Sequence, residues 1–479
     1  MEESLKYKAI KGVMWSAIER FSVQGIQFVL TIIIARLVSP SDYGLIAMLG
    51  IFLAIAQTFI DSGFSNALMQ KQDRTEKDFS TVFYFNIIVG VFVYLLLYLC
   101  SSYVAIFYNE PKLDSITKIV GFNLVISSFS VVQRAKLTIA LNFKLQAIAS
   151  LIAVVASGGL GVYMAYVGYG VWAIVLQTLL NNFLNTLLLW ILARWIPQIC
   201  FSWKSFRVLF GFGSKLLLSG ILHTTYTNLY SIVIGKQFSS IELGYYNRAY
   251  SIAYFPSNNI SSILTRAIYP IQCSIQDDNE RLRNSFLQYL RVAVYVIFPL
   301  MIGLCLLAEP LVLLILTNKW MHMVPLLKIM CIAYMWDPVM MINHNILTAK
   351  GHSGYFLKAE ILKKITAVAI LIVTIPFGIE IMCMGLIFYA FSDIFIISRF
   401  VYKVVGVTLM SQITAILPIL LLNVFTGLVI YVLNLFVQPI SLKLILSILF
   451  GFVFYVGLSY LFKFKEVQLV QSVFTKNRL

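Results

Sequence analysis

The sequence predicts an all-α protein that crosses a membrane about fourteen times, and three observations lead to this fold class. The 479 residues are 60% hydrophobic and only 12% charged, which is about half the charged fraction of an ordinary soluble domain. The apolar residues gather into windows of roughly 20 residues or more, the length that a helix needs to cross a bilayer. The charged residues fall mostly in the short breaks between these windows, where membrane topology is set.

The fourteen windows account for nearly the whole chain. Their approximate limits are 10–36, 43–69, 80–103, 114–139, 145–167, 170–194, 211–235, 242–271, 286–308, 322–348, 355–376, 380–404, 409–435 and 440–462. No break is long enough for a folded soluble domain, and we expect no removable signal peptide before the first helix. The segments "KDFSTVF" and "SWKSFRVLF" are interpreted as anchors at the cytoplasmic membrane surface.

The basic residues predict the orientation of the helices. With the N-terminus placed in the cytoplasm, most of the 36 Lys and Arg residues fall on the cytoplasmic side, as the positive-inside rule requires. Both termini are therefore expected in the cytoplasm. The net charge of +16 follows from this bias, and no nucleic-acid partner is expected because no basic run is interleaved with aromatic residues.

Two stretches that lie two hundred residues apart share the same order of features. "IIIARLVSPSDYGL" begins at Ile32, and "IVIGKQFSSIELGY" begins at Ile232. In each, a cation ends one helix, a short polar turn follows, and an acid, Asp42 or Glu242, precedes the next helix. An acid is favourable there because the N-terminal end of a helix dipole is positive. The pattern predicts an internal repeat.

The repeat predicts the domain organisation. Six helices separate the two copies, and an even number leaves both copies with the same orientation, which predicts a pseudo-twofold axis along the membrane normal. The expected parts are an N-terminal lobe with helices one to six (1–200), a C-terminal lobe with helices seven to twelve (201–405), and helices thirteen and fourteen with a cytoplasmic tail (406–479). Two such lobes are typical of an alternating-access transporter.

The first of the two turns carries a family resemblance. The pattern A-R-x-L-x-P-x-x-Y-G, which runs from Ala35 to Gly44, together with the fourteen-helix layout resembles the polysaccharide transporter family, the exporters of O-antigen and exopolysaccharide units. This family belongs to the multidrug/oligosaccharidyl-lipid/polysaccharide exporter superfamily. The motif covers the first two helices, whereas the layout covers the whole chain.

The resemblance implies a flippase of the bacterial plasma (inner) membrane. Its substrate is an undecaprenyl-diphosphate-linked oligosaccharide, which moves from the cytoplasmic to the outer leaflet for lipopolysaccharide or other surface-polysaccharide synthesis. The expected partners are this lipid-linked oligosaccharide and membrane lipid. H⁺ or Na⁺ as a coupling ion and polysaccharide polymerase machinery are candidate partners.

The residues leave three other functions to compare. A multidrug cation antiporter of the same superfamily is disfavoured because deep basic residues favour an anionic substrate. A lipid II flippase stays open. A membrane polysaccharide polymerase is disfavoured because the chain has no sizeable catalytic loop and no D-x-D, H-E-x-x-H or P-loop motif. The six cysteines are scattered without a Cys/His cluster, so no enzyme activity, metal or cofactor is expected.

Polar residues inside the apolar windows are the candidate substrate site, because charges within a membrane usually face a cavity or a partner. Arg20 and Arg266 lie in helices one and eight, where related flippases carry arginines, and the resemblance implies that they bind the diphosphate. An arginine suits this role because its guanidinium offers paired donors to phosphate oxygens. For Arg20, pairing with Asp61 or snorkelling to the cytoplasmic face stays open.

Four further polar residues are candidates for the substrate cavity. His223 lies in a polar belt on helix seven and either lines a wet cavity or forms a hydrogen bond between helices. Arg248 is a candidate contact on the release side, with an interfacial anchor as the alternative. Asn258 and Asn259 are interpreted as cavity lining.

Four acids are candidates for gating or ion coupling, and each has a structural alternative. Glu19 is expected to orient a neighbour, and Asp61 either couples an ion or pairs with Arg20. Asp337 and Asp393 lie in helices ten and twelve, and the sequence identifies no close partner for either of them.

Overall fold

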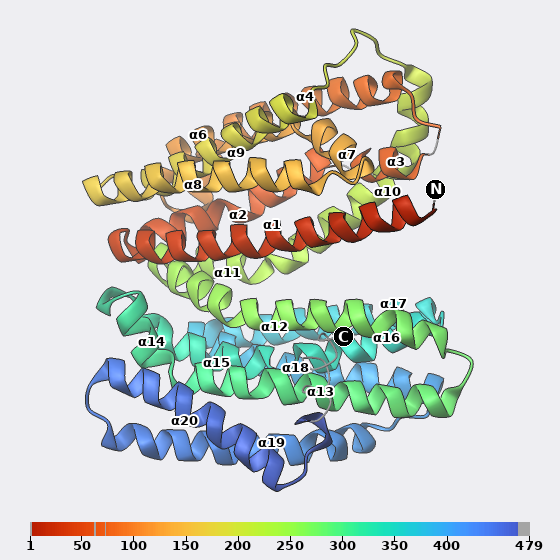
Figure 1. The fold of residues 1–479 in the computed structure, drawn as a ribbon. Helices are drawn as coiled ribbons and strands as arrows, with labels where there is room; N and C mark the ends of the chain where they lie inside the picture. Colours follow the sequence, from red (N-terminus) through yellow and green to blue (C-terminus); the bar gives the residue numbers. More distant parts are fainter. Residues whose placement is uncertain (1, 62–63, 72, 468–479) are drawn as a thin grey trace. The chain divides into compact units, whose positions relative to one another are not determined.

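The protein is described here from a computed structural model, which describes residues 2–61, 64–71 and 73–467 (Figure 1). In this part of the chain all regular structure is helical. The first half contains α1 (Glu2–Leu37), α2 (Pro40–Asp61), α3 (Phe64–Gln70), α4 (Glu76–Leu99), α5 (Ser101–Tyr108), α6 (Lys112–Ser128), α7 (Val131–Ile139), α8 (Phe143–Val167), α9 (Val171–Ala193), α10 (Trp203–Thr227) and α11 (Leu229–Gln237). The second half contains α12 (Ser240–Ser274), α13 (Asn279–Leu306), α14 (Ala308–Ile315), η1 (Asn318–Met323), α15 (Val324–Tyr334), α16 (Asp337–Ala349), α17 (Ser353–Thr374), η2 (Ile375–Phe377), α18 (Ile379–Val405), α19 (Leu409–Phe436) and α20 (Ile440–Leu461).

In the part of the chain that the structure describes, each of the fourteen predicted membrane segments is helical, and several of them consist of two consecutive α-helices, such as α2 with α3 and α15 with α16. Within the described residues, ten helices are long and apolar enough to cross a membrane. The prediction of an all-α polytopic membrane protein is therefore confirmed. α12 and α17 are not among the ten. α17 carries four charged residues within two turns: Lys358, Glu360, Lys363 and Lys364.

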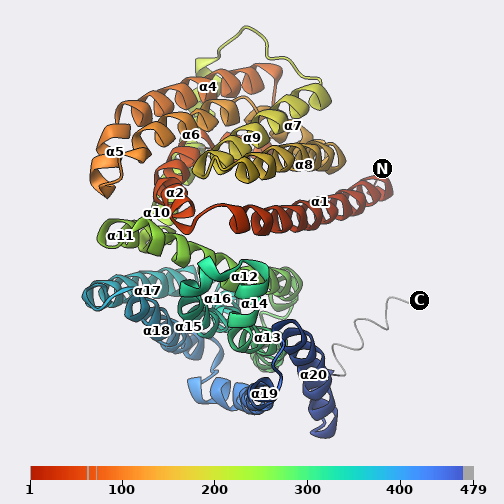
Figure 2. The ribbon, with the colours of Figure 1, turned by 90° about the vertical axis from the view of Figure 1, so that its left-hand side faces the viewer.

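The chain divides into two compact units, Met1–Gly244 and Tyr245–Leu479. In the first unit, α8 packs along α1 and α9, and α4 packs on α6 (Figure 2). α10 and α11 pack on α2 of the same unit. The predicted division at residues 200 and 405 concerns the sequence repeat and stays a prediction.

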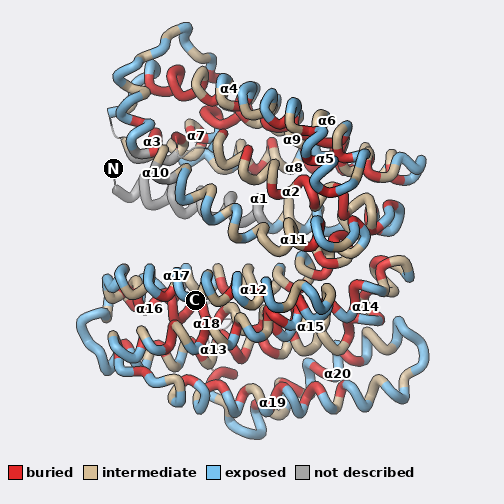
Figure 3. Tube along the Cα trace, turned by 180° about the vertical axis from the view of Figure 1, so that it is seen from behind, coloured by how far each residue is buried: buried red, intermediate tan, exposed pale blue. Residues whose placement is uncertain are grey.

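The second unit is built around α13 and α18. α13 contacts α15, α16 and α19, whereas α18 contacts α15, α16 and α17. α20 packs on α14 and α19 at one edge of this unit (Figure 1). Buried positions run along α16 and α18, where these inner helices face their neighbours (Figure 3). A buried polar group on these two helices therefore costs free energy unless it finds a partner within the protein.

The two repeated turns form the same local structure. In the first, Asp42 N donates to Ser39 Oγ at 3.2 Å, and Ser39 Oγ donates to Asp42 Oδ2 at 2.7 Å. In the second, Glu242 N donates to Ser239 Oγ at 3.2 Å, and Ser239 N donates to Glu242 Oε2 at 3.1 Å. Both are reciprocal Ser-to-acid caps, which satisfy amide groups at the start of the following helix. The predicted favourable acid at each helix start is confirmed.

These two turns also pack against each other. A Cβ atom added to Gly44 would collide with the carbonyl oxygen of Ser240, and one added to Gly244 would collide with that of Pro40. The contacts are reciprocal. Gly44 lies against Ser240, which is the repeat counterpart of Pro40, and Gly244, which is the counterpart of Gly44, lies against Pro40. This is the arrangement expected of two segments related by a twofold axis. Glycine is needed at both positions because the backbones touch without intervening side chains.

We expect Gly44→Ala to destabilise the protein, because its new methyl group has no space against the Ser240 backbone. Overpacking of this kind costs about 1–3 kcal/mol. The measurement is the thermal unfolding midpoint of the purified protein in detergent. Gly50→Ala in the same helix is the matched control, because nothing lies within 4 Å of its added Cβ.

The control should be neutral or slightly stabilising, because alanine forms helix better than glycine by about 1 kcal/mol. Equal midpoints for Gly44→Ala and Gly50→Ala would contradict the close backbone contact.

Candidate functional site

A group of charged side chains lies inside the second unit, where α16, α17 and α18 meet. Lys363 Nζ of α17 donates to Glu360 Oε1 at 2.8 Å and lies 3.3 Å from Asp393 Oδ2 of α18. The same ammonium lies 3.2 Å from His344 Nε2 of α16. Asp393 is 2% exposed and His344 is 8% exposed. We call these four residues the Lys363 cluster.

Helix geometry explains why these residues meet. Glu360 and Lys363 are three residues apart and therefore share one face of α17. α17 and α18 are neighbours joined by η2. At 1.5 Å per residue, Lys363 lies about 17 Å before the end of α17 and Asp393 about 21 Å after the start of α18, so the two reach similar heights. The hydropathy pattern alone does not predict that Lys363 and Asp393 lie at similar heights.

Two amide side chains on either side of His344 fix the rotation of α16. Asn343 Nδ2 donates to Gln412 Oε1 of α19 at 3.0 Å, and Asn345 Nδ2 donates to Thr265 Oγ1 of α12 at 3.1 Å. His344 lies between them on the third side of the helix and faces α17 and α18. The imidazole is therefore directed at the cluster by the packing of its neighbours.

The Lys363 cluster holds more negative than positive charge. Glu360 and Asp393 contribute two carboxylates, whereas Lys363 contributes one ammonium. Within the part of the chain that the structure describes, Asp393 Oδ1 and His344 Nδ1 have no hydrogen-bond partner. Buried charges are tolerated only when they are paired, so this site pairs its charges incompletely.

Asp337, which the sequence left without a partner, has one in α12. Ser257 Oγ lies 3.1 Å from Asp337 Oδ2 and donates to the Tyr334 carbonyl at 2.8 Å. The Ser257–Asp337 and Thr265–Asn345 pairs are eight residues apart on both helices. Equal spacing in the same direction means that α12 and α16 run parallel, as the predicted helices eight and ten do.

The other predicted residues of α12 differ in exposure. The Arg248 guanidinium carbon lies 5.5 Å from the centroid of the Trp320 ring, within the range of a cation–π contact. Asn258 is half-buried, and Asn259 Nδ2 donates to a carbonyl one turn earlier in its own helix at 2.9 Å. Arg266 is exposed.

The candidates near the start of the chain lie in the first unit. Glu19 accepts a hydrogen bond from Ser150 Oγ of α8 at 2.9 Å, so it links α1 to α8. Asp61 ends α2, is exposed, and accepts a hydrogen bond from Gln57 Nε2 at 3.2 Å. The side chain of Arg20 lies outside the described part of the structure, so its pairing with Asp61 stays a prediction.

The polar belt of helix seven lies on α10. His223 is exposed, and Thr224 Oγ1 lies 3.3 Å from Thr58 Oγ1 of α2. One side of the belt therefore contacts α2 through a hydroxyl pair. The histidine itself is on the accessible part of the helix.

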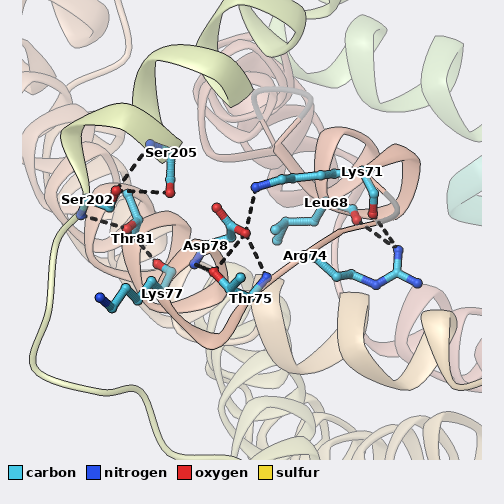
Figure 4. Close-up of polar contacts among 9 residues, drawn as sticks. All are labelled: Leu68, Lys71, Arg74, Thr75, Lys77, Asp78, Thr81, Ser202 and Ser205. Carbon is cyan, nitrogen blue, oxygen red and sulfur yellow. Dashed lines mark hydrogen bonds and ion pairs between the residues drawn. The ribbon is translucent and has the colours of Figure 1, made fainter.

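A second polar network closes the turn between α3 and α4 (Figure 4). Asp78 Oδ2 accepts from Lys71 Nζ at 2.8 Å and from the backbone amide of Thr75 at 2.7 Å. Arg74 Nη1 donates to the carbonyls of Leu68 and Lys71 at 3.3 and 2.8 Å, where α3 ends. Both helix ends at this turn are therefore satisfied by side chains.

The start of α4 also holds the segment between α9 and α10. Trp195 Nε1 donates to Glu76 Oε2 at 2.6 Å, and the Ser202 amide donates to Thr81 Oγ1 at 3.0 Å. Residues 78–83 are buried, so the predicted surface anchor "KDFSTVF" is wrong. Its polar residues are tethers within the unit, whereas Trp203 in the other predicted anchor is 62% exposed.

Sequence reasoning did not single out Glu360 and Lys363. In the sequence, Lys363 is one of several basic residues near a predicted cytoplasmic loop. A signal was present, because an acid and a base three residues apart inside an apolar window form a pair on one helix face. Their partners His344 and Asp393 lie on other helices, and nothing in the local sequence links them.

Comparisons with known proteins identify both similar sequences and similar folds. The chain is 28% identical to the lipopolysaccharide biosynthesis protein WzxC of Escherichia coli (strain K12), over 75% of this chain and 74% of that protein. It is 27% identical to the teichuronic acid biosynthesis protein TuaB of Bacillus subtilis (strain 168), over 73% of each.

Among solved structures, the fold is similar to the lipid II flippase MurJ in an inward closed conformation. That match has a TM-score of 0.77 and 14% identity, and it covers 94% of this chain and 98% of that one. A multidrug resistance MATE family transporter of the MOP superfamily matches with a TM-score of 0.63 and 12% identity, over 81% and 98% of the two chains. Residues 33–325 match the polysaccharide biosynthesis protein family, and the chain belongs to this family.

Proposed function

We propose that the protein is a flippase for undecaprenyl-diphosphate-linked oligosaccharides. It moves the repeat units from the cytoplasmic to the outer leaflet of the bacterial plasma membrane by alternating access, and the units are used for lipopolysaccharide or other surface polysaccharide. The observation that carries the proposal is the fold of a lipid II flippase over 94% of the chain, in a member of a polysaccharide biosynthesis family.

The physical task of a flippase is to pass a polar head group through an apolar layer. Unpaired charges in hydrocarbon cost several kcal/mol each, so the protein must supply a polar route. α12 and α17 are more polar than the other long helices of the second unit, and α10 carries its belt from His223 to Asn228 in the first. Within the second unit, we assign glycan contacts to α12 and α17.

Arg20 and Arg266 are proposed to bind the diphosphate. Arg266 is exposed on α12, so its guanidinium is accessible to a ligand. A planar guanidinium binds phosphate oxygens in pairs, and its charge persists at any physiological pH. Arg248 is assigned a structural role, because its guanidinium lies over the Trp320 ring.

A lipid II flippase is the closest competing function, because MurJ shares the fold. Lipid II and the lipid-linked repeat units share the polyprenyl diphosphate and differ in the glycan. The two functions are separated by offering both lipids to the same protein. A multidrug antiporter, which the MATE similarity suggests, would instead require export of small organic cations.

We expect wild-type protein in proteoliposomes to move a fluorescent undecaprenyl-diphosphate oligosaccharide between leaflets. Arg20→Ala and Arg266→Ala should each slow this movement about tenfold or more, because a charge-assisted hydrogen bond contributes about 1.5–3 kcal/mol. Arg283→Ala is the matched control, because Arg283 is an exposed arginine in the first turns of α13.

The control should move the lipid at the wild-type rate. Unchanged movement in Arg20→Ala and Arg266→Ala would discard the arginine pair and keep the flippase. Failure of the wild type to move any polyprenyl-diphosphate glycan would discard the function.

We expect both termini to lie in the cytoplasm. In a variant without the six native cysteines, Lys112→Cys should react with a membrane-impermeant maleimide on intact cells, whereas Asp277→Cys should react only after permeabilisation. Both side chains are exposed in turns or at helix ends, so a difference in labelling reports the side of the membrane. The reverse labelling pattern would invert the orientation.

A further inference from the structure

The Lys363 cluster carries one negative charge in excess, which a single bound proton would neutralise. Lysine is only a donor, so His344 Nε2, 3.2 Å from Lys363 Nζ, must act as the acceptor. The ring is therefore neutral and carries its proton on Nδ1. With two carboxylates and one ammonium, the cluster has one negative charge in excess, buried between three helices of a membrane protein.

Asp393 offers a place for the missing proton. Its Oδ2 lies 3.3 Å from the Lys363 ammonium, whereas its Oδ1 is buried and has no hydrogen-bond partner among the described residues. His344 Nε2 lies 3.9 Å from Oδ1. A hydronium ion would transfer its proton to a lone pair of Oδ1 and leave a water molecule, and the proton would return to water by the reverse step. Because the groups are in contact, the proton belongs to the cluster rather than to one residue.

The position of a sodium ion is already filled. A metal cation in this site would have to lie between Glu360 and Asp393, where the Lys363 ammonium now lies 2.8 Å and 3.3 Å from their oxygens. Displacing the ammonium would leave two cations side by side. Within the described residues, no group of three or more His, Cys, Asp or Glu side chains could hold a metal ion. The ammonium acts as a cation tethered to the chain.

Proton binding would alter only the links between helices. Glu360 and Lys363 are both on α17, so their 2.8 Å ion pair survives any movement of that helix. Within the described residues, Asp393 and His344 join the ammonium to α18 and α16. A proton on Asp393 removes the charge that attracts Lys363 across the α17–α18 contact. Occupancy by a proton therefore loosens α17 from α18 without breaking α17 itself.

Other charged groups lie on α16, α17 and α18 and on the neighbouring α13. On α17, Lys364 attracts Glu360. On α16, Asp337 lies about two turns before His344 and 3.1 Å from Ser257 Oγ, and its charge repels that of Asp393. On α18, Arg399 lies over the Phe395 ring. On α13, the Arg291 guanidinium pairs with Glu466.

The remaining contacts around α16 are neutral. α12 contributes Thr265, which accepts from Asn345, and α19 contributes Gln412, which accepts from Asn343. Neither residue titrates, so neither supplies the charge that the cluster lacks.

We propose that the Lys363 cluster is a proton-binding site and that H⁺, rather than Na⁺, is the coupling ion of this transporter. The proton-binding part stands on the cluster alone, whereas the coupling part rests on the proposed flippase function. The two parts are therefore tested by separate measurements on the same purified protein.

The first measurement is infrared difference spectroscopy of the protein in nanodiscs during a pH titration. We expect wild type to gain a carbonyl band of a protonated carboxylic acid on acidification, and we expect Asp393→Asn to lack it. Asp277→Asn is the matched control, because Asp277 is exposed in the turn before α13, and it should keep the band. A band that persists in Asp393→Asn would overturn the proton site.

The second measurement is lipid movement in proteoliposomes with an imposed gradient of either H⁺ or Na⁺. We expect a proton gradient to accelerate wild-type movement of the fluorescent undecaprenyl-diphosphate oligosaccharide several-fold and a sodium gradient to have no effect. Asp393→Asn should lose the response to protons. Acceleration by sodium alone would overturn the coupling proposal while leaving the flippase intact.

Misfolding is controlled with two further variants. Lys363→Met/Asp393→Asn removes the ion pair together and leaves neither partner as an isolated charge, and it should fold and be insensitive to the proton gradient. Asp393→Glu keeps the carboxylate and should restore part of the response. If the infrared band behaves as expected but no lipid moves, the proton site stands and the flippase function fails.

Discussion

The cost of a charge inside a bilayer is the constraint on which this structure depends. A helix in hydrocarbon satisfies its own backbone groups, but each buried carboxylate or ammonium needs a partner from another part of the chain. Glu19 accepts a hydrogen bond from Ser150, Asp337 lies beside Ser257, and Asp393 lies beside Lys363. Each pair joins two helices. The polar residues that function requires therefore also decide which helices lie together.

The repeated turns solve a different problem, which is how to bring two helix starts together. A serine and an acid cap each start through side chains, so amides at the start of the next helix gain partners where the chain changes direction. Gly44 and Gly244 then allow the two backbones to touch, each against the repeat of position 40. Capping and close packing are separate requirements, and the repeat keeps both. The two turns lie two hundred residues apart in the sequence and meet the same geometric requirements.

The predictions succeeded where the signal is local. Hydropathy alone located fourteen helical segments, and the order of charges located the acids Asp42 and Glu242 at two helix starts. They failed for "KDFSTVF", whose alternation of polar and apolar residues suggested a surface helix. The structure buries residues 78–83 because Ser80 and Thr81 accept hydrogen bonds from amides of the 194–202 segment. Their partners are more than a hundred residues away, and no window of sequence contains both.

The sequence by itself determined the membrane class, the fourteen helical segments, the charge bias that predicts their orientation, and the two similar turns, since each is a pattern of residue types along the chain. It did not determine where a segment divides into two helices, as one does between α2 and α3. Only the tertiary structure decided which charges meet. Lys363 and Asp393 belong to different helices, and their contact depends on the rotation of each helix about its axis. That rotation is set by packing, including the Asn343–Gln412 and Asn345–Thr265 pairs. Helical periodicity indicates which face of a helix is polar, but it does not indicate which other helix that face will touch.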